Sequence, residues 1–191
     1  RNCERFAIFL LSRDGLRLRG VFVPHGDSRA TVLLMHGYRA KGGIADFSVI
    51  LPYYASLGLN ILLIDERACG ESEGRYICFG VQERYDCADW CAYLDGRFGG
   101  DCRILLDGIS MGASTVLMAS GLPLPQSVCA IVADCGFVSP WQECRYVAKQ
   151  MHLPLCLLPL VDVWCRLLAK FSLREASTTA ALAVNRRPVL F

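Results

Sequence analysis

The opening part of the chain alternates apolar with polar or small side chains. Residues 16–23 follow this pattern, residues 6–11 form a second strand-like run, and Asp14-Gly15 lies between them. Alternation is typical of a half-buried antiparallel strand, and Asp-Gly is a strong hairpin signal. We therefore expect the chain to begin with a β-hairpin.

Four later apolar runs do not alternate: residues 31–35, 60–64, 103–106 and 130–133. Runs of this kind suit strands that are covered on both faces, as in a parallel sheet. Three segments of helical length and spacing lie between or after them: residues 47–57, 81–98 and 111–120. The alternation of strands and helices predicts an α/β fold, with a mostly parallel sheet and helices on both faces.

The last fifty residues depart from this rhythm. Residues 139–185 are mostly apolar and helix-like, are interrupted by Pro154 and Pro159, and contain no strand signal. We interpret them as a helical cap inserted over the carboxyl edge of the sheet. Residues 188–191 have the pattern of another buried strand. We therefore expect residues 1–191 to form a single domain whose last strands lie beyond Phe191.

Composition narrows the function classes. The chain has 191 residues, 53% of them hydrophobic, and a net charge of +2 without a clustered basic face, which argues against a nucleic-acid-binding protein. It has no uninterrupted apolar stretch of the roughly 20 residues that a membrane span needs. It opens on Arg1 without a signal-peptide pattern, so we expect its natural N-terminus to lie upstream.

The eleven cysteines are not arranged in C-x-x-C pairs, and histidine is scarce. This spacing does not suit zinc, and no cofactor fingerprint accompanies it. Most cysteines stand inside apolar runs, where a free thiol behaves as a small hydrophobic residue; examples are Cys129, Cys135, Cys156 and Cys165. The sequence therefore favours reduced thiols and a cytoplasmic compartment, with neither a metal nor a cofactor.

The pattern G-x-S-x-G occurs twice, around Ser72 and around Ser110. In this motif a serine sits on a sharp turn between a strand and a helix, and the glycines make room for that turn. Ser110 follows a buried strand and precedes a helix of small residues. Ser72 lies well after its strand, between Glu71 and Glu73, whose charges would oppose a developing oxyanion. We predict that Ser110 is a nucleophile and that Ser72 belongs to a polar loop.

A second motif, His36-Gly37-Tyr38, directly follows the first central strand. With a nucleophile elbow, the loop at this place donates one backbone N–H to the oxyanion, and the residue after the nucleophile donates the other. We therefore assign the predicted oxyanion hole to the backbone N–H groups of Tyr38 and Met111. His36 itself is expected to hold the loop rather than to act as a base.

Taken together, the motifs resemble the α/β-hydrolase superfamily. The chain is similar to bacterial serine hydrolases described as esterases, lipases or prolyl-aminopeptidase-like proteins. The resemblance rests on the segments LLMHGY, GLNILLIDERACGESEG, GVQERYDCADWCAYL, GISMGAST and IVADCGF, which occur in the family's order. One departure is Cys69, where relatives commonly have histidine, which puts local packing in question. Asp65 and Arg67 in the same loop are expected to form a structural pair.

A serine nucleophile needs a histidine base and a carboxylate to orient it, which follow the serine in this fold. The resemblance implies that both lie beyond residue 191. Two substitutes stand inside the chain: Asp134, which ends a strand, as the acid, and His152 as the base. Otherwise Asp134 is a loop support and His152 a partly buried cap residue. His25 is expected at the surface.

The leading hypothesis is a serine hydrolase that cleaves an ester, thioester or amide bond of a small acyl or peptide-like substrate through an acyl-enzyme on Ser110. The competing hypothesis is a non-catalytic hydrolase-like module, or an inactive remnant, that lacks the histidine of the triad. Retention of both the Ser110 turn and the His36 loop favours the enzyme. Nothing in the pattern specifies an oligomeric state.

Overall fold

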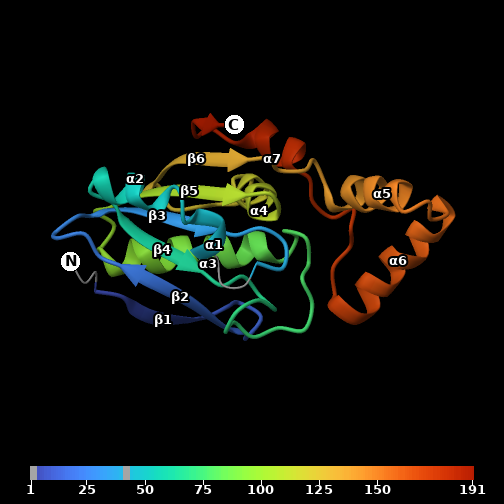
Figure 1. The fold of residues 1–191 in the computed structure, drawn as a ribbon, viewed down its shortest axis with the longest axis horizontal. Coiled ribbons are helices and arrows are strands. Elements are labelled where there is room, and N and C mark those ends of the chain that lie inside the picture. Colours follow the sequence, from blue (N-terminus) through green and yellow to red (C-terminus); the bar gives the residue numbers. More distant parts are fainter. Residues whose placement is uncertain (1–3, 41–43) are drawn as a thin grey trace.

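The computed structural model describes residues 4–40 and 44–191, which form one sheet with helices on both faces (Figure 1). The order of strands across the sheet is β1-β2-β4-β3-β5-β6-β7. The strands are β1 (Phe6–Leu11), β2 (Arg17–Val23), β3 (Ala30–Met35), β4 (Asn60–Ile64), β5 (Arg103–Ile109), β6 (Val128–Asp134) and β7 (Val189–Leu190). β1, β2 and β4 pair antiparallel, whereas β4, β3, β5, β6 and β7 pair parallel. The predicted hairpin and the predicted parallel sheet are both confirmed.

The helices come in the order α1 (Ile44–Phe47), α2 (Leu51–Ser56), α3 (Glu83–Arg97), α4 (Met111–Ala119), α5 (Pro140–Gln150), α6 (Leu158–Trp164) and α7 (Thr178–Val184). The predicted helices at 81–98 and 111–120 are confirmed with slightly shorter bounds. The helix predicted over 47–57 is confirmed in part: α2 covers residues 51–56, whereas Phe47 is the last residue of α1 and residues 48–50 form a turn between the two helices. Pro52 stands in the first turn of α2, where its missing N–H is tolerated, and so it favours the start of a new helix.

The central strands are buried on both faces, which explains why their sequences do not alternate. Leu33 on β3 and Leu62 on β4 face the layer formed by α3 and α4, together with Trp90 of α3. Val32 and Leu63 face the opposite layer, which contains Phe47 and Tyr54 of the two short helices. Burying apolar side chains on both faces stabilises the sheet by roughly 25 cal/mol per Å² of surface removed from water.

The segment after β6 leaves the body of the sheet at the carboxyl ends of β5 and β6 (Figure 1). It comprises α5, a 3₁₀ turn (Leu155–Leu157), α6 and a π-helical turn (Cys165–Ala169), and these helices keep many apolar side chains exposed, Trp164 and Leu167 among them. α7 instead packs against α4. None of the helices in the described residues is both long and apolar enough to cross a membrane.

The final strand β7 pairs with β6 in parallel, as the pattern of residues 188–191 predicts. Its burial differs from the prediction, since 65% of Leu190 and 77% of Phe191 are exposed. Leu190 lies on the outermost strand of the sheet, which has a single neighbouring strand, and Phe191 directly follows it.

Candidate active site

Ser110 stands on the turn between β5 and α4. Its backbone φ is +55° and its ψ is −112°, a conformation that costs a residue other than glycine on the order of 1–3 kcal/mol. The turn brings Ser110 to the N-terminus of α4, where the helix dipole is positive. Within the described residues the Ser110 hydroxyl has no hydrogen-bond partner. The structure therefore holds this side chain in a strained and unpaired position.

The two glycines of the motif are required by close backbone contacts. A Cβ on Gly108 would run into the carbonyl of Gly112, and a Cβ on Gly112 would run into the carbonyl of Met35. Gly112 also faces His36, whose carbonyl oxygen would lie 2.7 Å from such a Cβ. The turn at Ser110 thus brings α4 directly against the end of β3, which only glycines permit.

The neighbouring strand fixes the turn. The Ser110 N–H donates a hydrogen bond of 2.8 Å to the carbonyl of Asp134, at the end of β6. The Ser114 hydroxyl, one turn further along α4, donates to the Phe137 carbonyl (3.0 Å) and accepts from the Phe137 N–H (2.7 Å). These bonds hold the loop after β6 against the first turn of α4.

The loop after β3 lies beside Ser110. Its residue His36 is fully buried; Nδ1 bonds to the Gly37 carbonyl (2.8 Å), and Nε2 accepts from the Glu66 N–H (3.0 Å). Because both ring nitrogens are engaged, His36 holds the loop, as the sequence predicts. A Cβ on Gly37 would lie 3.7 Å from the Ser110 Cβ, which places this loop next to the nucleophile candidate.

The backbone N–H groups of this loop have different partners. The Gly37 N–H donates to the carboxylate of Asp46 on α1 at 2.8 Å. Among the described residues, the N–H groups of Tyr38 and Met111 have no acceptor. Tyr38 and Met111 are the two residues that the sequence assigns to an oxyanion hole, and that assignment stays a prediction. Asp46 was not anticipated, since no motif marks it.

A cavity of about 360 Å³ opens beside Ser110 and is named the Ser110 cavity below. Tyr38, Met111, Glu143 and Cys144 line it together with side chains that are wholly apolar, namely Phe79, Phe137, Val147, Ala148, Leu153 and Leu158. The Tyr38 and Phe79 rings are stacked, with centroids 5.5 Å apart and planes 11° apart. The helical segment after β6 therefore supplies one wall of the space in front of Ser110, as expected for a cap.

A buried carboxylate holds Phe79 in this wall. Glu83 accepts hydrogen bonds from the N–H groups of Cys78 (2.6 Å) and Gly80 (2.9 Å), the residues on either side of Phe79. Phe79 itself has a φ of +52°, so its backbone also needs support from its surroundings. Burial raises the pKa of Glu83 to about 7, although the two N–H bonds act in the opposite direction. No sequence motif marks this arrangement, because Phe79 lies in a loop.

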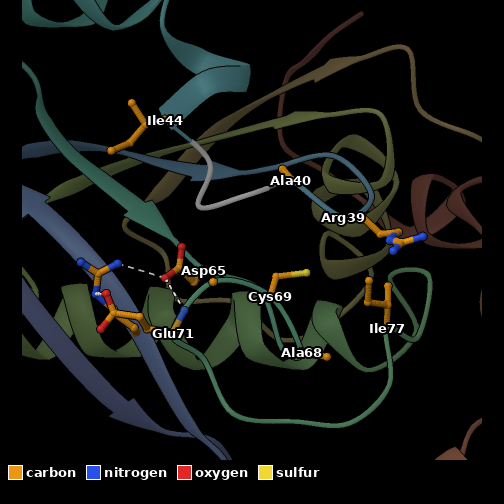
Figure 2. A pocket seen from close by; sticks show the side chains of 10 residues that line it. Arg39, Ala40, Ile44, Asp65, Ala68, Cys69, Glu71 and Ile77 are labelled. Atoms are coloured by element: carbon orange, nitrogen blue, oxygen red, sulfur yellow. Dashed lines mark hydrogen bonds and ion pairs between the residues drawn. The ribbon is translucent and has the colours of Figure 1, made fainter.

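Figure 2 shows a second cavity, of about 620 Å³, which Arg39 and Ala40 of the loop after β3 help to line. Arg39, Cys69 and Ile77 are among its lining residues, and Asp65 in its wall accepts hydrogen bonds from Arg19 (3.1 Å) and from the Glu71 N–H (3.1 Å). Ser110 is absent from its lining residues. We assign the candidate site to the smaller Ser110 cavity, because a nucleophile candidate and unpaired N–H groups converge only there among the described residues.

The predicted pair of Asp65 with Arg67 is wrong. Asp65 pairs with Arg19 on β2, whereas Arg67 forms a two-bond ion pair with the buried Asp86 of α3 (2.7 and 2.6 Å) and also binds Asp14. The two side chains leave the loop in different directions, so each finds a partner on a distant element. Ser72 is a loop residue, as predicted, since its hydroxyl donates to the Asp65 carbonyl at 2.6 Å.

Glu66 lies between Asp65 and Arg67 in the sequence. Its side chain is buried, and neither carboxylate oxygen has a hydrogen-bond partner among the described residues. Burial, together with the nearby Glu83, Asp86 and Asp46, raises the pKa of Glu66 well above its usual value. A raised folded-state pKa means that the folded protein binds this proton more tightly than the unfolded chain does. The unfolding free energy should therefore fall as the pH rises above about 4.5, the ordinary glutamate pKa.

Replacing Glu66 with glutamine is expected to remove this loss. Denaturant unfolding should show Glu66→Gln more stable than the wild type at pH 8, with a smaller difference at pH 5. The comparison variant Glu83→Gln should lose about 1–3 kcal/mol at pH 5, because an amide offers only one oxygen to the two N–H donors. The loss should be smaller at pH 8, because the raised pKa of Glu83, about 7, makes ionisation costly in the folded wild type and glutamine does not ionise. A Glu66→Gln protein that is less stable than the wild type at pH 8 would contradict this account.

The three histidines are all within the described residues, and the structure brings none of them to the Ser110 hydroxyl as a base. His36 is committed to the loop. His25 is exposed and lies near Gly58, at the amino ends of the parallel strands and so at the edge opposite Ser110. His152 follows α5 and is exposed rather than partly buried as predicted. It is also absent from the lining of the Ser110 cavity.

Asp134, the other internal substitute, ends β6 beside Ile109 and is exposed. Its backbone carbonyl supports Ser110. A role as the acid stays a prediction.

The cysteines divide differently from the prediction. Cys129, Cys135 and Cys156 are exposed, whereas the most buried thiols lie on α3 and in the loops before it. The ten cysteines in the described residues are free thiols. A position inside an apolar run does not ensure burial, because Cys129 stands on an outward-facing position of β6 and Cys156 stands in the projecting cap. Across the described residues, no three His, Cys, Asp or Glu side chains are grouped as metal ligands.

Known proteins resemble this chain in sequence and in fold. The uncharacterized protein YqkD of Bacillus subtilis is 27% identical over 190 residues, which are 98% of this chain and 62% of that protein. The α/β hydrolase GrgF of Penicillium sp. covers 95% of this chain and 74% of its own, with a TM-score of 0.60 at 19% identity. The chain has an α/β-hydrolase fold.

The esterase Pf2001 of Pyrococcus furiosus has the same fold, with a TM-score of 0.74 at 22% identity over 98% of this chain and 68% of that one. The α/β-hydrolase fold accounts for the mostly parallel sheet with helices on both faces. No family model matches the chain. The chain spans less than two thirds of the length of YqkD.

Proposed function

We propose that this α/β-hydrolase-fold protein is a serine hydrolase that cleaves an ester, thioester or amide bond through an acyl-enzyme on Ser110. The observation that carries the proposal is the position of Ser110, on a strained strand-to-helix turn with an unpaired hydroxyl in the wall of the Ser110 cavity. A loop serine of purely structural role satisfies its hydroxyl locally, as Ser72 does. Ser110 does not, although its φ makes the turn costly.

In the proposed reaction the Ser110 Oγ attacks the carbonyl carbon of the substrate, and its proton passes to a base. The negative charge that develops on the carbonyl oxygen is stabilised by the N–H groups of Tyr38 and Met111, with the N-terminus of α4 adding a positive field. The tetrahedral intermediate then expels the leaving group, which takes up the proton. Water then attacks the acyl-enzyme and gives its proton to the base. The second tetrahedral intermediate expels the Ser110 oxygen, which takes up that proton, and the acid product is released.

The base and its carboxylate are proposed to lie outside residues 1–191, in the order that the fold uses. This choice is supported by the three internal histidines, none of which is placed to accept the Ser110 proton. The partial coverage of YqkD is compatible with a longer natural protein. The oxyanion donors are supported by the engagement of a neighbouring group, since the N–H of Gly37 donates to Asp46.

The apolar walls of the Ser110 cavity support a small acyl or peptide-like substrate. Its volume of about 360 Å³ lies in the range of small-molecule sites. Names of relatives with this fold include an esterase and an α/β hydrolase, which favours a carbonyl substrate over other chemistry.

A fluorophosphonate probe tests this function in the full natural protein. Such a probe phosphonylates a serine only when the serine is activated and an oxyanion hole is present. We expect one label per molecule, located by fragment mass spectrometry on Ser110, and blocked by prior incubation with an ester substrate. Labelling on another serine, or none under conditions that label a known esterase, would overturn the assignment.

A further inference from the structure

The Ser110 cavity contains a feature that acyl transfer does not require. Glu143, on the first turns of α5, is the one lining residue with a formal charge among the described residues. The remaining lining side chains are apolar, aromatic or neutral. A carboxylate in such a space creates a local negative potential, because low-dielectric walls screen it less than water does.

Glu143 has no counter-ion at hand. No salt bridge or hydrogen bond to its carboxylate occurs within the described residues, although the basic side chains of α5 are nearby in sequence. A helix turns by about 100° per residue, so Cys144, Val147 and Ala148 share the face of Glu143 that lines the cavity. Arg145 and Lys149 fall on other faces and are exposed. The negative charge of Glu143 is therefore available to a cationic ligand in the cavity.

The aromatic side chains of the cavity reinforce this charge. The stacked pair of Tyr38 and Phe79 lies on one side, and Phe137 lies in the loop that follows β6. The faces of aromatic rings carry negative partial charge and attract ammonium groups, most strongly where water is excluded. One carboxylate together with three aromatic rings is a combination that recognises a cation with an apolar surface.

We propose that the Ser110 cavity selects substrates that carry a cationic, ammonium-type group near the scissile carbonyl, with Glu143 as the residue that determines this specificity. The reaction itself rests on the proposed function of Ser110, whereas the recognition of the cation does not. Glu143 also stands in the first turn of α5, where an acidic residue favours the helix dipole. A role in the helix alone would leave the preference for charge unaltered.

Matched ligands that differ only in charge test the inference in the full natural protein. Butyrylcholine and 3,3-dimethylbutyl butyrate have the same shape, with a nitrogen cation in the first and a neutral carbon in the second. We expect the wild type to prefer butyrylcholine by about tenfold or more in kcat/KM. In Glu143→Gln this ratio should fall by about tenfold, mainly through KM.

The control variant is Asp27→Asn, which removes one negative charge from an exposed residue outside the cavity. It should keep the wild-type ratio, which would exclude an effect of overall charge. A wild type without preference for butyrylcholine, or a preference that survives in Glu143→Gln, would overturn the inference.

Binding without turnover separates this inference from the proposed function. Choline and its neutral isostere 3,3-dimethylbutan-1-ol can be titrated into Ser110→Ala protein and followed by ligand-observed NMR. Tighter binding of choline that is lost in the Ser110→Ala, Glu143→Gln double variant supports the inference even if no ester is hydrolysed. Hydrolysis of both esters at equal rates, with no choline binding, would leave the proposed function standing and refute the inference.

Discussion

Ser110→Ala is expected to lower the kcat for a reactive ester, such as p-nitrophenyl butyrate, by roughly 10⁴-fold or more. Alanine removes the oxygen that would form the acyl-enzyme, and the Tyr38 and Met111 N–H groups cannot replace a nucleophile. Thermal unfolding should be affected little, because the hydroxyl has no hydrogen-bond partner among the described residues. Steady-state kinetics on the full natural protein, with circular dichroism as a fold check, measures both effects.

Ser72→Ala is the matched control, since Ser72 occupies the same position in the other G-x-S-x-G sequence. Its hydroxyl accepts from the Arg19 N–H (2.8 Å) and donates to the Asp65 carbonyl (2.6 Å). We expect a loss of about 1–3 kcal/mol in stability and a kcat per folded molecule close to that of the wild type. If Ser72→Ala abolished turnover while Ser110→Ala retained it, the nucleophile would be misassigned.

Gly112→Ala is expected to destabilise the protein by more than about 3 kcal/mol, enough to prevent folding of a marginally stable domain. The new Cβ would overlap the backbone carbonyl of Met35 and lie 2.7 Å from the His36 carbonyl oxygen. Backbone atoms in a central strand cannot move aside as a flexible side chain can. Alanine normally favours a helix over glycine, so the direction of this effect is opposite to the intrinsic propensity.

Gly96→Ala is the control for that propensity. Gly96 lies in the last turn of α3, and nothing stands within 4 Å of the Cβ it would gain. This substitution should stabilise the protein by up to about 1 kcal/mol. Denaturant unfolding of both variants measures the contrast, and equal effects of the two substitutions would show that the close approach of α4 to β3 is not tight.

The sequence predicted the architecture well where the residue pattern is local. Strands such as β3 and β4 are buried on both faces, and a run without alternation reports this directly. The turn at Ser110 could be predicted because the sequence places glycines at the two positions, 108 and 112, where a Cβ would overlap the backbone. Apolar spacing continues across the break between α1 and α2 and therefore does not predict it, whereas Pro52 in the first turn of α2 favours the start of a new helix.

The partners of side chains were harder to predict because they come from distant elements. Arg67 binds Asp86, 19 positions later in sequence, rather than Asp65 in its own loop. The walls of the Ser110 cavity likewise combine Tyr38, Phe79 and Glu143 from three separate segments. No spacing in the sequence predicts that these residues meet. They meet because their three segments come together at the carboxyl edge of the sheet. The sequence marks Glu143 only as an acidic residue in the first turn of an amphipathic helix.

Trapping of the acyl-enzyme tests the central claim most directly. The full natural protein is mixed with p-nitrophenyl acetate, quenched in acid during turnover, digested and mapped by tandem mass spectrometry. The account predicts one acetyl group on the Ser110 side chain, which accumulates with the burst of p-nitrophenol and disappears as the substrate is exhausted. Turnover with no acetylated serine at any quench time, or acetyl on a residue other than Ser110, would contradict it.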